Sequence, residues 1–141
     1  MLVVLLASAC LGGCTQRGGG LFGQPEQAAH QEHPLLVGVP LPRGFRLVPE
    51  RSSGVDNPRM RLGKYAFTGR TSPDELFAFF TRTMGPAGYT LRQRGFDNGL
   101  YSMVFTSAYE ELRINIRRVG MGTDLSLEMI PVIQDAPAQP Q

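Results

Sequence analysis

The chain has 141 residues, of which 42% are hydrophobic, and its formal net charge is +2. This length fits one small domain with tails, and a domain of about 100 residues buries roughly 60–65% of its unfolded surface, enough for a core of its own. The basic residues are thirteen arginines and Lys64, with no basic run. The charge pattern therefore does not indicate a nucleic-acid-binding protein.

The chain opens on a short apolar block, LVVLL at Leu2–Leu6, which Ala7, Ser8 and Ala9 follow. A membrane-spanning helix needs about 20 apolar residues. The block therefore predicts the hydrophobic region of a signal peptide. Its flank lacks the usual Lys or Arg.

The segment Leu11-Gly12-Gly13-Cys14 resembles the lipobox of bacterial lipoproteins, with an aliphatic residue, two small residues and then a cysteine. The resemblance implies a signal peptide at 1–13 and lipidation of Cys14, which becomes the new N-terminus. More than one acyl chain gives stable membrane attachment. Because Thr15 follows the cysteine, the resemblance implies export to the outer membrane, facing the periplasm.

Cys10 offers two alternatives. It could itself be the modified residue, although Ala7 at its −3 position fits the lipobox less well than Leu11. A Cys10–Cys14 disulfide or half of a metal site is also conceivable, but no third or fourth ligand lies nearby in the sequence.

Residues 14–40 are rich in Gly, Gln, Pro and small polar residues and show no sustained period, which predicts a flexible tether. The histidine pair of His30 and His33 lies in this tether, so we expect no metal site there. Residues 133–141, IQDAPAQPQ, predict a second disordered tail.

One helix is predicted with its N-terminus defined by sequence. Ser72 is the expected N-cap, Pro73 the first helical residue, and Glu75 completes a capping box. Gly85 and Pro86 are expected to end it. Its apolar residues follow the helical spacing of one buried face: Leu76, Phe79, Phe80, Thr83 and Met84.

Strands are predicted before and after this helix. GFRLV and MRLGKYAFTG precede it, and Gly63 is expected to mark a bulge. Tyr89–Gly95 follows, then a three-residue loop Asp97-Asn98-Gly99 with Gly99 in the left-handed conformation. Apolar residues alternate with polar ones in three further segments, around Tyr101–Phe105, Leu112–Ile116 and Leu125–Met129.

The last two of these segments predict a hairpin whose loop is Gly120-Met121, a type II′ turn with glycine first. In this register Arg117 lies opposite Asp124 and Arg113 lies opposite Glu128 on the outer face. Opposite charges therefore face each other in the register that the turn favours.

The order of elements, β-β-α-β-β-β-β, predicts an α+β fold over residues 41–132. We expect an antiparallel meander curved around the single helix, because one helix covers a wide flat sheet poorly.

The chemistry of this domain is limited, because residues 41–131 contain no His, Cys or Trp. That removes imidazole, thiol and His/Cys metal chemistry from it. The paired carboxylates have ordinary explanations: a capping box for Asp74 and Glu75, and a hairpin tip for Glu110 and Glu111. We therefore expect no catalytic residues, no cofactor and no metal, and a protein that is not an enzyme.

Core and turn residues form a spaced sequence pattern, with segments at Tyr65-Ala-Phe-Thr-Gly69, Phe79-Phe80 and Gly88-Tyr89-Thr90-Leu91. It resembles small, largely uncharacterised α+β domains of bacterial envelope lipoproteins. It is also similar to the helix-grip domains of outer-membrane assembly lipoproteins, which bind a β-barrel insertion machine. The resemblance implies a fold and carries over no binding residues.

Three functional hypotheses follow. The leading one is a membrane-anchored, non-enzymatic interaction module of the cell envelope with a protein partner. The second is a small-molecule or lipid-binding domain with the ligand between helix and sheet, suggested by five aromatic residues: Phe77, Phe79, Phe80, Tyr101 and Phe105. The third, nucleic-acid binding through Arg92, Arg94, Arg113 and Arg117, conflicts with the export signal and lacks an aromatic stacking pair.

Overall fold

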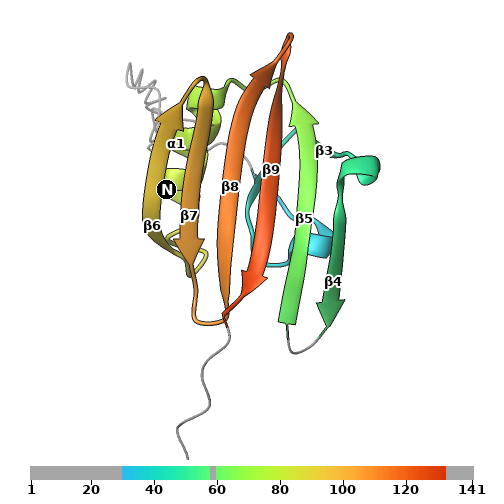
Figure 1. The fold of residues 1–141 in the computed structure, drawn as a ribbon, viewed down its shortest axis with the longest axis vertical. Helices are drawn as coiled ribbons and strands as arrows, with labels where there is room; N and C mark the ends of the chain where they lie inside the picture. Colours follow the sequence, from blue (N-terminus) through green and yellow to red (C-terminus); the bar gives the residue numbers. More distant parts are fainter. Residues whose placement is uncertain (1–29, 58–59, 133–141) are drawn as a thin grey trace, which may run out of the picture.

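The computed structural model describes residues 30–57 and 60–132, in which one helix lies on one side of an antiparallel sheet (Figure 1). The strands of the sheet are β3 (Arg46–Leu47), β4 (Ser53–Asn57), β5 (Met60–Gly69), β6 (Thr90–Asp97), β7 (Leu100–Thr106), β8 (Glu110–Val119) and β9 (Gly122–Pro131). The other elements are the helix α1 (Pro73–Thr83), the 3-10 helices η1 (Pro34–Leu36) and η2 (Pro49–Arg51), and a small strand pair, β1 (His30–Gln31) with β2 (Leu41–Pro42). The predicted signal peptide, Cys14 and the tail at 133–141 lie outside the described residues.

The sheet has the order β3-β5-β9-β8-β7-β6, and β4 also pairs with β5. The predicted α+β fold, with an antiparallel sheet and one helix, is confirmed at this level. A meander in strict chain order is wrong, because β5 neighbours β9 and not β6. The helix α1 carries the chain across the inner face of the sheet, so β6 begins at the far edge and the strands β6 to β9 then return to β5.

The helix begins where the sequence predicts. Ser72 is the N-cap, its hydroxyl accepts a bond from the Glu75 backbone N–H at 3.3 Å, and the Glu75 carboxylate accepts one from the Ser72 N–H at 3.1 Å. Four of the five residues predicted for its buried face are buried: Leu76, Phe79, Phe80 and Met84.

Replacing Ser72 with alanine should lower the free energy of unfolding by about 1 kcal/mol, because the first helical turn loses its capping acceptor. Denaturant unfolding measures the change, and Thr71→Ala is the matched control that should leave the midpoint in place. Equal midpoints for the Ser72 variant and the parent would contradict the role of the cap.

The β8–β9 hairpin has the predicted register. Arg117 lies opposite Asp124 and Arg113 lies opposite Glu128, and the loop is Gly120-Met121 with φ of +57° at Gly120. The side chains form other ion pairs than the expected ones, because Asp124 contacts Arg51 at 2.8 Å and Arg113 contacts Glu111 at 2.8 Å. The predicted loop between β6 and β7 is one residue too long. Asp97 pairs directly with Leu100, and Asn98 (φ +46°) and Gly99 (φ +75°) form a two-residue turn in which both residues are left-handed, as in a type I′ turn.

Gly63 does not mark a bulge, since the pairing of β5 with β4 continues through it without a shift, and it also pairs with Met129 of β9. A Cβ there would lie 2.8 Å from the Gly54 Cα and from the Ser53 carbonyl oxygen. Glycine therefore allows close approach of β4 and β5.

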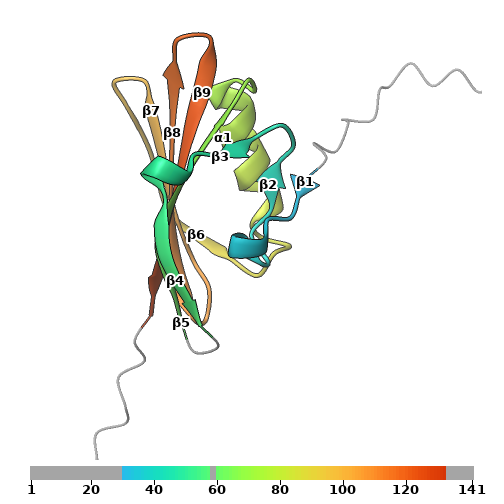
Figure 2. The same ribbon diagram turned by 90° about the vertical axis from the view of Figure 1, so that its right-hand side faces the viewer.

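Residues 30–40 differ from the predicted tether. They form β1 and η1, and Leu36 and Val39 are buried in the main core. The Gln31 side-chain amide donates to the Phe45 carbonyl at 2.9 Å. The His33 ring packs edge-on against the Phe67 ring, with 5.6 Å between the ring centroids. Figure 2 shows this segment on the same side of the sheet as α1. The folded part of the chain thus begins before Leu41, and we call residues 30–40 the N-terminal strap.

Candidate functional site

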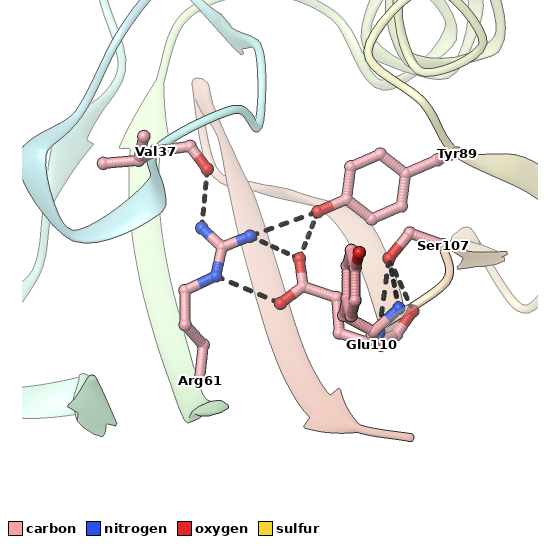
Figure 3. A network of polar contacts seen from close by, with 6 residues as sticks. Val37, Arg61, Tyr89, Ser107 and Glu110 are labelled. Carbon is pink, nitrogen blue, oxygen red and sulfur yellow. Dashed lines mark hydrogen bonds and ion pairs between the residues drawn. The ribbon is translucent and has the colours of Figure 1, made fainter. Parts of the chain in front are cut away.

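Arg61, Tyr89 and Glu110 form a polar cluster (Figure 3) in which Tyr89 and Glu110 are buried and Arg61 is half-buried. Arg61 is near the start of β5, Tyr89 comes directly before β6, and Glu110 is the first residue of β8. Glu110 lies at inner-face parity with Leu112 and Ile114, which directs its carboxylate inward.

The geometry of the cluster is that of a bidentate ion pair. The Arg61 Nε–Oε2 distance to Glu110 is 3.1 Å, and the Arg61 Nη2–Oε1 distance is 2.5 Å. The Tyr89 hydroxyl donates to Oε1 of the same carboxylate. Arg61 Nη1 donates to the Val37 carbonyl at 2.6 Å, so the guanidinium also holds the N-terminal strap.

The environment shifts the pKa of both partners of Glu110. Burial raises the pKa of Tyr89, and the hydrogen bond and charge of Glu110 raise it further, while Arg61 opposes the shift. The phenol therefore stays protonated at neutral pH and acts as a donor. Burial alone would lower the pKa of Arg61, but the hydrogen bond and charge of Glu110 outweigh it and raise the pKa.

Beside the cluster is a cleft of about 610 Å³. Arg61, Tyr89 and Glu110 lie at its wall, and its rim includes Met60 and Tyr109, whose exposed fraction is 80%. A second hollow of about 510 Å³ separates the C-terminal half of α1 from the N-terminal strap.

The cluster is arranged for holding elements together. Both Glu110 oxygens already accept bonds from Arg61, and Oε1 also accepts the Tyr89 hydroxyl. These three hydrogen bonds to the Glu110 carboxylate join β8 to β5 and to the start of β6. The guanidinium extends the connection to the Val37 carbonyl of the strap.

The residues singled out from the sequence are not brought together at this cluster. Cys14 and Cys10 lie outside the described residues. His33 caps η1 by accepting the Leu35 N–H at 3.2 Å. No group of three or more His, Cys, Asp or Glu that could hold a metal ion is found in residues 30–57 and 60–132.

The aromatic residues behind the ligand hypothesis belong mainly to the core. Phe79, Phe80 and Phe105 are buried in one cluster, and the Phe79 and Phe80 rings contact each other at 5.2 Å. Phe77 and Tyr101 are half-buried at the margin of this cluster, with 5.3 Å between their ring centroids. Packing therefore accounts for the residues that suggested a ligand between helix and sheet.

The arginines of the nucleic-acid hypothesis lie at separate places. Arg113 forms an ion pair with Glu111 at 2.8 Å, and Arg117 is opposite Asp124 across the hairpin. Arg92 donates to the Thr106 hydroxyl at 2.8 Å, and Arg94 is on the edge strand β6.

Sequence reasoning missed the Arg61–Tyr89–Glu110 cluster, because it assigned Glu110 to a hairpin tip. One signal was present. Glu110, Leu112, Ile114 and Ile116 share one parity, so a carboxylate continues the inward-facing row of β8.

Comparisons with protein-family models, with curated proteins and with solved structures find no match to this chain. Within the part of the chain that the structure describes, no helix is both long and apolar enough to cross a membrane.

Proposed function

We propose that this chain is a bacterial envelope lipoprotein, anchored by acyl chains on Cys14, whose domain is a non-enzymatic interaction module. The observation that carries the proposal is the sequence Leu11-Gly12-Gly13-Cys14 directly after a short apolar block. Small residues before the cysteine allow a peptidase to approach the backbone, and the thiol is the acyl acceptor.

The position of the folded domain fits an anchor at Cys14. His30, the first described residue, lies sixteen positions after Cys14 (30 − 14). A chain of that length spans at most about 53–58 Å when fully extended. The domain would therefore stay close to the bilayer, which we propose is the outer membrane on its periplasmic side.

The domain itself supports a binding role more than a chemical one. The carboxylate of Glu110, the one buried carboxylate in residues 30–57 and 60–132, is occupied by Arg61 and Tyr89. We propose no catalytic residue, cofactor, metal or nucleic-acid partner. The partner classes are the membrane, through Cys14, and a protein of the envelope.

Replacing Cys14 with serine should abolish incorporation of a fatty-acid analogue, while Cys10→Ser should leave labelling unchanged. Metabolic labelling in a bacterial host measures both variants side by side. Loss of label in the Cys10 variant alone would move the anchor to Cys10, and no label in the parent would reject the anchor.

The interaction role needs its own experiment, in which the labelled parent is crosslinked in cells and purified. We expect a specific envelope protein, or a second copy of the chain, among the crosslinked products. Recovery of neither would contradict an interaction module.

A further inference from the structure

Among the described residues, strand β6 forms one edge of the sheet and pairs only with β7 (Figure 1). It is eight residues long, and most of its residues are exposed. Exposed edge strands offer unpaired backbone groups to another chain, and proteins usually block them. The opposite edge is interrupted, because β3 and β4 are separate short strands and η2, which begins at Pro49, lies between them.

The regular part of the β6 edge is Gln93–Asp97. The pairing with β7 is irregular between Leu91 and Gln93, and then continues without interruption to the turn. Arg92, at the irregularity, is held by the Thr106 hydroxyl of its own sheet. The remaining five residues have the extended geometry that pairs with another strand.

The turn determines which backbone groups face outward. In a two-residue hairpin the pair that flanks the loop, here Asp97 and Leu100, exchanges both of its hydrogen bonds. The pairs then alternate, so Gly95 also bonds to β7, whereas the N–H and C=O of Arg94 and Phe96 point away from the sheet.

The side chains of Arg94 and Phe96 are available at the same edge. In the described residues Arg94 has neither an ion pair nor a side-chain hydrogen bond. Phe96 has an exposed fraction of 64%, and its ring contacts Tyr101 at 4.6 Å. Both side chains lie at the parity of Met103 and Tyr101, on the helix side of the sheet.

We propose that β6 is a self-complementary interface that pairs antiparallel with β6 of a second copy, with the two-fold axis at Gly95. In this register Arg94 lies opposite Phe96 of the other copy, and Phe96 lies opposite its Arg94. These two pairs use the four outward backbone groups of each strand. They also place a guanidinium against an exposed aromatic ring twice, which is a favourable cation–π arrangement.

The remaining residues of the edge agree with the same register. Gln93 lies opposite Asp97 of the second copy, and its side-chain amide can donate to that carboxylate on the outer face. Gly95 lies opposite itself, where a side chain is absent. A shift of two residues would place Arg94 opposite Arg94 or Phe96 opposite Phe96, so charge and ring contacts both favour the symmetric arrangement.

This inference rests on the proposed interaction role, because it names one partner, a second copy. It does not need the lipid anchor. The interface and the anchor can be separated by testing the interface twice, once in the chain with its native cysteines and once in the Cys10→Ser/Cys14→Ser variant.

A disulfide crosslink tests the register in cells that produce the full chain. Gly95→Cys should form an oxidant-dependent dimer, because the facing Cα atoms of a non-hydrogen-bonded pair are about 4.5 Å apart. Gln93→Cys is the control, since two copies of residue 93 would be separated by roughly 14 Å along the strands. A parent without the added cysteine corrects for crosslinking through Cys10 or Cys14.

Crosslinking at Gly95 and not at Gln93, in both backgrounds, is the expected result. No dimer at Gly95, or equal dimer at both positions, would overturn the interface. Absence of acylation on the chain with the native N-terminus, with the Gly95 crosslink retained, would reject the anchor and leave the interface standing.

A second pair of variants tests the backbone pairing without a crosslink. Arg94→Pro removes an outward N–H that β7 does not use, and Arg94→Ala removes only the side chain. By sedimentation of the full chain in detergent, the dimer dissociation constant of the proline variant should exceed that of the alanine variant by about tenfold. Equal constants, or a parent that is monomeric at the highest attainable concentration, would overturn the proposal.

Discussion

Replacing Glu110 with alanine will lower the free energy of unfolding by about 3 kcal/mol, because it leaves the Arg61 guanidinium without its ion-pair partner. The side chain of Glu110 is 6% exposed and that of Arg61 is 23% exposed, so solvent replaces the lost contacts only in part. The Tyr89 hydroxyl loses its acceptor in the same variant. Chemical denaturation of the full chain measures the change.

Two further variants separate the ion pair from general effects of substitution. Glu111→Ala removes a neighbouring carboxylate whose pair with Arg113 is more exposed, and it should cost less than about 1 kcal/mol. The double variant Arg61→Met/Glu110→Leu should recover much of the loss, since an apolar pair leaves no charge unpaired. A loss below about 1 kcal/mol for Glu110→Ala would contradict a stabilising role of the Arg61–Tyr89–Glu110 cluster.

Replacing Leu36 with alanine will lower the free energy of unfolding by about 3 kcal/mol, the typical cost of a buried leucine. Leu36 is 0% exposed and belongs to the same core cluster as Phe67 and Ile114. The substitution leaves a cavity under the N-terminal strap. The large effect is expected although residues 30–40 have the composition of a linker.

Leu35 is the matched control, because it lies on the same 3-10 helix and is 41% exposed. Leu35→Ala should change stability by no more than about 0.5 kcal/mol. If the two variants unfold at the same denaturant concentration, the strap is not part of the cooperative fold.

The elements that the sequence predicts well are those specified by local patterns. The start of α1 follows from the capping box of Ser72 and Glu75, and both of its hydrogen bonds are present. The β8–β9 register follows from alternation and from a loop with glycine first. In both cases the residues that determine the structure lie within one helical turn or one hairpin.

The elements that it misses depend on partners far away in the chain. β1 and β2 have two residues each, too few for a period, and the composition of β4, SGVDN, is typical of a turn. Strand β4 forms because Ser53–Asn57 meets β5 across a close-packed pair of glycines, Gly54 and Gly63. The charged cluster needs Arg61 and Glu110, 49 positions apart, to converge. The order of the sheet likewise depends on where α1 delivers β6, which no local pattern encodes.

Intact-mass analysis of the protein purified from membranes tests the central claim, a Cys14-anchored envelope lipoprotein, most directly. The account predicts a chain that begins at Cys14, lacks residues 1–13, and carries the added mass of a diacylglyceryl group with a further amide-linked acyl chain. A protein that retains Met1–Gly13, or that begins at another residue without acyl mass, would contradict it.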